Sequence, residues 1–214
     1  MLGTISKLVL FILLIVVCIS YLSQNNSFEV YMYDIGQGDS LRVKMPNGVN
    51  LLIDGGPDYT IDRYLSNDFF LACSIDVLLL THPHADHIAG LVRYLNRCTP
   101  IVLISNFTIY DSVLFSEWEE LIKKGKVISV AKGDTFYFGN VRMDILWPPL
   151  ATANEIDSTI NNSSIVTYLS YGGLDALLLG DSELPVLKQL KLPSDLDILK
   201  IPHHGSVTGM YIPI

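Results

Sequence analysis

The chain has 214 residues, enough for one catalytic domain or two very small ones, which excludes a large multidomain enzyme. Half of its residues are hydrophobic and 17% are charged, a composition too apolar for a disordered protein. The formal net charge is −8, which argues against a protein that binds nucleic acid by bulk electrostatics. A metal site is compatible with this charge, because bound cations supply the positive charge.

The hydrophobic excess is concentrated in an uncharged segment, Leu8 to Leu22. Lys7 precedes it and the first basic residue after it is Arg42, so we expect a cytoplasmic N-terminus and an exported remainder. As a helix the segment spans about 22 Å, which is shorter than the roughly 30 Å hydrocarbon core of a membrane. Two interpretations stay open: an uncleaved membrane anchor, which we favour, and a cleaved signal peptide that leaves the domain secreted. We assign residues 1–24 to this segment and residues 25–214 to one extracytoplasmic domain.

The three cysteines, Cys18, Cys73 and Cys98, cannot all pair with one another, and Cys18 lies in the apolar segment. Cys73 and Cys98 could form a disulfide if the domain lies outside the cytosol. We favour the other interpretation, in which both are buried free thiols.

Short strand-like segments begin at Phe28 and later alternate with helix-like ones. Pro46-Asn47-Gly48 predicts a hairpin turn, because proline presets one backbone angle and Asn-Gly tolerates the next. The apolar run Val77 to Leu80 predicts a strand covered on both faces. We expect strands at 28–34, 41–45, 49–53, 77–80, 101–104, 135–138, 141–147, 164–171, 176–179 and 197–201, and helices at 88–95, 114–122 and 184–190. This pattern favours layered sheets flanked by helices, an α/β fold.

The strongest motif directly follows the buried strand. His82, His84, Asp86 and His87 place four metal-binding side chains within six residues, where a strand leads into a helix. Loops at the carboxyl ends of buried strands are where α/β folds place their chemistry. Imidazoles and carboxylates are ligands that zinc prefers in catalytic sites. Three of the chain's five histidines lie in this loop, so the pattern predicts a metal site rather than a chance cluster.

Further residues that can bind a metal lie at the ends of other predicted strands. Asp181 follows an apolar run, where it is poorly placed for the core and well placed as a ligand shared between metals. His203 and His204 are adjacent at the end of the last predicted strand. Neighbours on an extended chain point in different directions, so we expect one histidine to bind metal and the other to support it or to face the substrate.

Four motifs occur in an order that resembles the metallo-β-lactamase superfamily: Leu52–Gly56, Thr81–His87, Leu179–Asp181 and His203–Gly205. Two further motifs, Asp34–Ser40 (DIGQGDS) and Ile201–Ser206 (IPHHGS), are similar to the C-terminal domain of ComEC-type DNA-uptake proteins and their stand-alone relatives. The resemblance covers nearly everything from residue 28 to residue 206. It implies an αβ/βα sandwich with one or two Zn²⁺ ions at the strand ends, with Mn²⁺ as an alternative.

The resemblance also implies roles for individual residues. The first metal is expected at His82 and His84, the second at Asp86, His87 and His203, and Asp181 is expected to bridge them. His204, together with Asp86 and Asp181, is expected to take part in catalysis. Residues expected to support the ligands or to face the substrate are Asp54, Asp39, Gln37, Asn162 and Ser206.

The implied activity is hydrolysis of phosphodiesters by a metal-activated hydroxide, with single-stranded or degraded DNA as the substrate. No protein partner is predicted, and membrane contact is expected through the N-terminal segment. Two departures from the family pattern lead us to expect that the domain is C-terminally incomplete, and they leave open an alternative, a catalytically impaired module of the same fold. The chain has no histidine from Ile88 to Pro202, where many superfamily hydrolases have another ligand and where Asn162 or Ser164 could face the metal, and it stops at Ile214. A third interpretation keeps catalysis with another ester, such as a phosphorylcholine ester or a lactone.

Overall fold

The computed structural model describes residues 6–7, 9–16, 27–68, 73–106, 108–150, 160–192 and 195–209. Residues 6–7 and 9–16 are helical and exposed. Within the described ranges, no helix has the length and apolar character needed to cross a membrane. The expected membrane segment also includes Leu8 and residues 17–22, which lie outside the described residues. The prediction of a membrane-spanning helix is therefore not confirmed.

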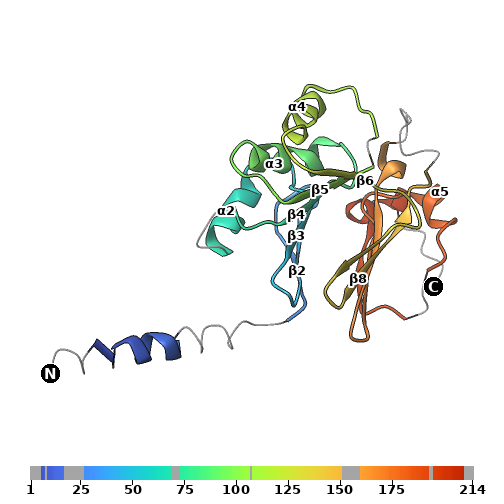
Figure 1. Ribbon diagram of the computed structural model, residues 1–214. Coiled ribbons are helices and arrows are strands. Elements are labelled where there is room, and N and C mark those ends of the chain that lie inside the picture. Colours follow the sequence, from blue (N-terminus) through green and yellow to red (C-terminus); the bar gives the residue numbers. More distant parts are fainter. Residues whose placement is uncertain are drawn as a thin grey trace.

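Two β-sheets lie face to face with helices outside them (Figure 1). The first sheet has six strands in the order β1 (Glu29–Met32), β2 (Leu41–Lys44), β3 (Asn50–Ile53), β4 (Val77–Leu79), β5 (Val102–Ser105) and β6 (Val127–Ser129). β1, β2 and β3 pair antiparallel, whereas β3 to β6 are parallel. The parallel strands are joined through α2 (Thr60–Asp68), α3 (Ala85–Leu95) and α4 (Val113–Ile122). Because such crossovers are right-handed and the strands follow in order, all three helices cover the same face.

The second sheet has five strands in the order β11 (Ile198–Lys200), β10 (Leu174–Leu178), β9 (Val166–Tyr171), β8 (Val141–Trp147) and β7 (Thr135–Phe138). Its pairs are antiparallel except for β10 and β11, which run parallel. α5 (Leu184–Leu187) connects these two strands. Three short 3₁₀ helices complete the described elements: η1 (Ile160–Ser163), η2 (Pro202–Gly205) and η3 (Val207–Gly209).

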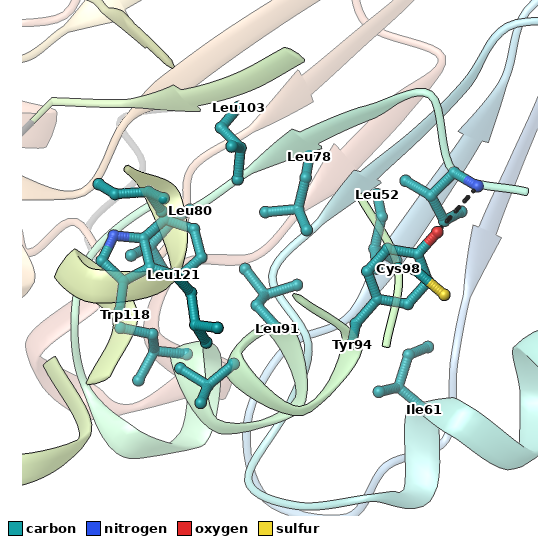
Figure 2. Close-up of a cluster of buried hydrophobic side chains, with 14 of the residues drawn as sticks. Leu52, Ile61, Leu78, Leu80, Leu91, Tyr94, Cys98, Leu103, Trp118 and Leu121 are labelled. Carbon is teal, nitrogen blue, oxygen red and sulfur yellow. Dashed lines mark hydrogen bonds between the residues drawn. The ribbon is translucent and has the colours of Figure 1, made fainter. Parts of the chain in front are cut away.

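Alternation along the strands produces the layers. In β3, Leu52 packs against the helices, while Leu51 and Ile53 face the other sheet. Figure 2 shows the helix side of the first sheet, where Leu78 and neighbouring strand residues meet Trp118 and other helix residues. A third apolar cluster joins the outer face of the second sheet to α5. The described residues thus form four layers, and the predicted αβ/βα sandwich is confirmed.

Most predicted elements lie within a few residues of those observed, but α2 and β6 were not predicted. α2 has little apolar signal, because of its nine residues only Ile61 and Leu65 are buried apolar side chains. β6 has three residues, of which only Val127 and Ile128 are apolar, so its apolar run is shorter than those of β4 and β5.

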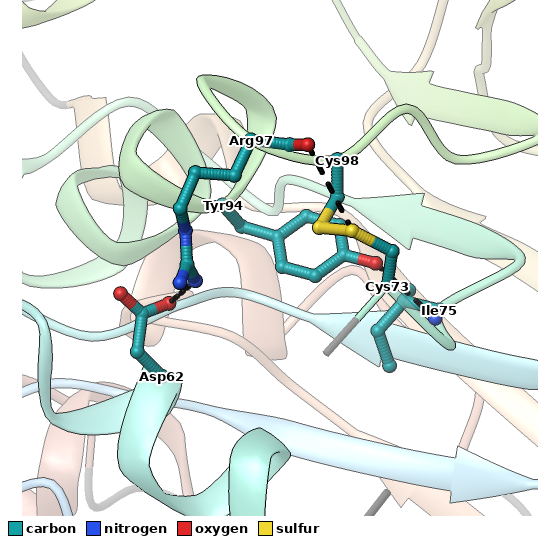
Figure 3. Close-up of a disulfide and its surroundings, with 6 residues drawn as sticks. All are labelled: Asp62, Cys73, Ile75, Tyr94, Arg97 and Cys98. Atoms are coloured by element: carbon teal, nitrogen blue, oxygen red, sulfur yellow. Dashed lines mark hydrogen bonds and ion pairs between the residues drawn. A yellow bond between two sulfur atoms is a disulfide. The ribbon is translucent and has the colours of Figure 1, made fainter. Parts of the chain in front are cut away.

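Cys73 and Cys98 form a disulfide (Figure 3). The preference for two free thiols is therefore wrong. The bond joins the segment that leads into β4 to the chain just after α3. The same region is held by Tyr94, whose backbone oxygen accepts from Cys98 N and whose hydroxyl accepts from Ile75 N at 3.2 Å. The sequence could not show this pairing, because it depends on where α3 ends in space.

Replacing both cysteines, Cys73→Ser/Cys98→Ser, should lower the free energy of unfolding by about 3 kcal/mol, because the bond closes a loop with a sequence separation of 25 in the unfolded chain. Urea unfolding of the full chain in mild detergent measures this loss. A reducing agent should bring the unchanged protein to the stability of the double variant and leave the variant itself unaffected. Equal urea midpoints for the oxidised protein and the variant would contradict the prediction.

Candidate metal centre

The predicted site residues follow the carboxyl ends of four strands. β4 leads into Thr81–His87, β3 into Asp54, β10 into Asp181, and β11 into the turn that carries His204. The first two strands belong to one sheet and the last two to the other. The two sheets therefore deliver their polar residues to one shared edge, as expected for an α/β fold.

Asp181 lies at the middle of this group. Its Oδ2 atom is 3.3 Å from His87 Nε2, 3.3 Å from His204 Nε2 and 4.0 Å from His82 Nε2. Asp86 approaches from the solvent side, with Oδ2 3.3 Å from His204 Nε2. Three imidazole nitrogens thus point at one carboxylate oxygen, the arrangement that the shared-ligand prediction for Asp181 requires.

Two of these histidines are each held by a carboxylate on the other ring nitrogen. His87 Nδ1 is 2.8 Å from Asp54 Oδ2, and His204 Nδ1 is 3.3 Å from Asp39 Oδ1. A partner on Nδ1 fixes the ring orientation and leaves Nε2 free to bind a metal. Asp54 is itself fixed, because it accepts from Thr81 N at 2.8 Å and from Thr81 Oγ1 at 2.6 Å. Asp54 and Asp39 therefore lie against the histidine rings, and their role in supporting ligands stays a prediction.

The backbone holds Asp54 next to His87 by a close approach of two glycines. Gly55 N donates to His87 O at 2.8 Å, and Gly90 N donates to Gly56 O at 3.0 Å. A Cβ atom at Gly90 would lie 1.9 Å from Gly55 O, and one at Gly55 would lie 2.4 Å from the backbone nitrogen of the residue after Gly90. Only glycine fits at either position, so α3 and the loop after β3 contact each other directly.

The structure places the adjacent histidines differently from the expectation that His203 is the one that binds metal. His204 reaches the centre, whereas His203 turns away, with Nδ1 3.2 Å from Glu183 Oε1 and 3.1 Å from Thr208 Oγ1. Both residues have positive φ, 48° and 51°, so the chain turns left-handed here instead of continuing as a strand. In an extended chain two neighbouring side chains point in opposite directions, and the residue types alone do not show which of them points inward.

Other predicted residues lie at varying distances from the centre. The half-buried His84 has its ring 4.8 Å from that of His82, but it belongs to none of the compact donor groups in the described part of the chain. Gln37 is exposed, Asn162 Oδ1 accepts from Glu183 N, and Ser206 Oγ contacts Thr208. These last three predicted residues are not brought into the cluster.

Ser164 and Lys200 are close to the ligands as well. Ser164 Oγ lies 3.3 Å from His82 Nδ1 and accepts from Asp181 N at 3.0 Å. Lys200 was missed by the sequence argument; it is 4% exposed, pairs with Asp39 Oδ2 and lies 3.7 Å from Asp181 Oδ1. Its ammonium also donates to Gly180 O at 2.8 Å. The sequence does contain a signal for Lys200, because a charged residue in a short strand directly before the two adjacent histidines lies close to the predicted site.

The buried charges perturb one another strongly. Burial opposes charge on His87, but attraction to Asp54 and Asp181 outweighs it and raises the pKa of His87 to about 10. Contacts with Asp181, Asp39 and Asp86 raise the pKa of His204 to about 11. Burial and the neighbouring His87 lower the pKa of His82 well below its ordinary value. Burial would raise the pKa of Asp181, but its contacts with His204 and His87 hold it below the usual range.

This donor set fits a divalent cation. The Nε2 atoms of His82, His87 and His204 are buried, and none makes a hydrogen bond of acceptable geometry to a residue that the structure describes, although Asp181 lies close to all three. Buried polar atoms without a partner are costly, and they mark places where an ion can bind. The donor atoms within each group lie within 4.8 Å of one another; the groups are His82, His87 and Asp181; Asp86, His87 and His204; Asp39, Asp181 and His204; and Asp39, Asp54 and His87. Overlapping imidazole and carboxylate groups suit one or two ions such as Zn²⁺.

The contrast between the two adjacent histidines can be measured. His204→Ala should weaken Zn²⁺ binding by more than tenfold, because it removes a nitrogen that points at Asp181 and Asp86. His203→Ala should change the affinity less than threefold, because His203 contacts Glu183 and Thr208 instead. Calorimetric titration of the metal-free full chain measures both affinities, and the opposite ranking would restore the original assignment.

Comparison with known proteins agrees with this arrangement. The sequence profile of the Metallo-beta-lactamase superfamily matches residues 33–211. ComE operon protein 3 of Bacillus subtilis (strain 168) is 29% identical over 95% of this chain and 28% of its own length. Uncharacterized protein YcaI of Escherichia coli (strain K12) is 25% identical over 88% of this chain and 24% of its own length. The chain thus spans about a quarter of the length of these curated relatives.

Solved structures show the same fold. Zn²⁺-bound PqqB from Methylobacterium extorquens superposes with a TM-score of 0.54 at 18% identity, covering 76% of this chain and 59% of that protein. A beta-lactamase from Chitinophaga pinensis also gives 0.54, at 16% identity, covering 84% and 77%. With the sequence match, the four layers and the donor cluster in place, the chain belongs to the metallo-β-lactamase superfamily of metal-dependent hydrolases, and its resemblance to ComEC-type proteins extends over nearly its whole length.

Proposed function

We propose that the domain is a metal-dependent phosphodiesterase that cleaves DNA, with single-stranded DNA as its substrate. The observation that carries the proposal is that two donor groups share Asp181. One group adds His82 and His87, and the other adds Asp39 and His204. Such an arrangement suits two cations that act on both sides of a displacement at phosphorus. The ComEC-type resemblance supports DNA as the source of the phosphodiester, and the similarity to ComE operon protein 3 agrees with it.

The residues of the chain would divide the work as follows. His82, His87, His204, Asp86 and Asp181 would hold Zn²⁺ or, as an alternative, Mn²⁺. Bound cations of this kind lower the pKa of water and stabilise charge on phosphate oxygens. Asp54 and Asp39 keep the imidazole rings oriented through their Nδ1 atoms. Lys200 offsets part of the carboxylate charge, since its ammonium lies against both Asp39 and Asp181.

We also propose that the domain lies outside the cytoplasm, tethered by residues 1–24 or released from them. The disulfide between Cys73 and Cys98 supports this location, because such bonds persist in oxidising compartments and are rare in the cytosol. The distribution of basic residues around Leu8 to Leu22 supports the same orientation.

One observation favours a second candidate, a metal-binding module without turnover. The chain has no histidine from Ile88 to Pro202, and Ser164 Oγ contacts His82 Nδ1 rather than the Nε2 atom that faces Asp181. An ion near His82 would therefore be held by fewer strong donors, because neither a further histidine nor this hydroxyl adds a ligand there. This candidate predicts metal binding without phosphodiester hydrolysis.

Turnover of bis-nitrophenyl phosphate and of single-stranded DNA by the full chain in mild detergent, stripped with EDTA and reloaded with Zn²⁺ or Mn²⁺, tests the proposal. EDTA should abolish turnover and the metal should restore it. Asp181→Asn should lower turnover by at least about 100-fold, because the Asp181 carboxylate lies against His82, His87 and His204. Glu120→Gln, an exposed carboxylate on α4, is the matched control and should leave turnover unchanged.

The outcomes separate the candidates. Metal binding with no hydrolysis of either phosphodiester would support the module without turnover. Hydrolysis of a phosphorylcholine ester or a lactone, with neither phosphodiester cleaved, would replace the proposed substrate by another ester.

A further inference from the structure

A hollow lined by arginines lies between α2 and α3, outside the metal centre. This arginine hollow has a volume of about 520 Å³ and is lined by Tyr59, Asp62, Arg63, Ser66, Arg93 and Arg97. Three arginines against one aspartate give its lining a charge of +2, on a chain whose net charge is −8. A positive concavity on an acidic protein indicates an anionic ligand.

Two of the arginines are held in place by a shared carboxylate. Arg93 Nε lies 2.9 Å from Asp62 Oδ2, and Arg97 Nη2 lies 2.6 Å from Asp62 Oδ1. Figure 3 shows Arg97 reaching from the end of α3 to Asp62 on α2. The arginine side chains are 59% and 46% exposed. A guanidinium has five N–H donors, so each arginine keeps donors for a ligand after pairing with Asp62.

Arg63 is the third arginine, and it connects the arginine hollow to the metal centre. It is exposed and has no hydrogen bond or ion pair to any residue that the structure describes. It also lines a second hollow of about 210 Å³ with Asp34, Thr60 and Tyr64. Asp34 in turn lines a third hollow, of about 380 Å³, which reaches His204. The three hollows are adjacent through these shared lining residues and form a row, whose last member is lined by His204 of the metal centre.

An aromatic ring completes the arginine hollow. Tyr59 is 58% exposed, and the Arg93 guanidinium lies 5.7 Å from the centre of its ring. Positive grooves that combine arginine with exposed aromatic rings bind single-stranded nucleic acid, because phosphates pair with the cations and bases stack on the rings. A lipid surface is a poorer fit, because the last hollow of the row is lined by His204 of the metal centre.

We propose that the arginine hollow binds phosphate groups of a single-stranded nucleic acid at a distance from the phosphate that is cleaved. The inference rests on the proposed function for the reaction at the metal centre. It defines the substrate class as a polymeric strand that occupies the row of hollows, rather than a small phosphodiester.

The test is binding of a fluorescein-labelled single strand of about 15 nucleotides to the full chain in mild detergent with EDTA, measured by anisotropy at several salt concentrations. Arg63→Ala is the main variant, because no described residue depends on Arg63 for a hydrogen bond or ion pair. Its affinity should fall about threefold to tenfold, and the slope of log affinity against log salt should fall by about 0.7, the value for one phosphate contact to a single strand. Lys123→Ala, at an exposed lysine directly after α4, is the matched control and should change neither quantity.

A double variant, Arg63→Ala/Arg97→Ala, should weaken binding further, with thermal unfolding as the check that it folds. Unchanged affinity and slope in both folded variants would overturn the inference. Weaker binding to phosphatidylglycerol vesicles with unchanged oligonucleotide binding would also overturn it and would identify a lipid surface instead. Because binding is measured without metal, an absence of phosphodiester hydrolysis would contradict the proposed function and leave this result intact.

Discussion

The centre depends on the burial of one carboxylate, Asp181, against the imidazoles of His82, His87 and His204. A buried carboxylate is costly unless charge or hydrogen bonds compensate it. Here the compensation comes from both sheets, since His82 and His87 follow a strand of the first sheet and His204 follows β11 of the second. The site therefore exists only where the two sheets meet, and each sheet alone would supply half of it.

The apolar layers keep that meeting point fixed. The cluster between the sheets includes Leu51 and Ile53 on one side and Met143 and Leu178 on the other, all buried. Leu51 and Ile53 lie in β3, whose end carries Asp54, and Leu178 lies in β10, whose end carries Asp181. Because close-packed interiors deform little, the packing fixes the positions of the strand ends that carry the polar residues. Lys200 continues the link on the polar side, since its strand belongs to the second sheet and its ammonium pairs with Asp39 of the first.

Much of the fold could be predicted from the sequence, because the deciding patterns are local. The unbroken apolar run of β4 and the helical spacing after it predicted a covered strand leading into a helix, and the structure has both. The contribution of His82, His87 and Asp181 to one cluster followed from their places at strand ends. What the sequence could not provide depended on three-dimensional placement: the Cys73–Cys98 bond, the turn of His203 away from the centre and the burial of Lys200. None of these has a local pattern, because each is set by a residue that is distant in the chain or by a left-handed backbone turn.

The contact between Gly55 and Gly90 determines how the centre can move. Backbone hydrogen bonds join the loop after β3 to α3 on both sides of this contact, so Asp54 and His87 are carried by one rigid body. Asp181 and His204 follow strands of the other sheet and approach the Asp54–His87 pair from the opposite side. A small displacement between the sheets would therefore leave the Asp54–His87 pair intact and change the separation of His87 from Asp181. The centre would open as two halves along this line, and the spacing between its donor groups would report on the relative position of the sheets.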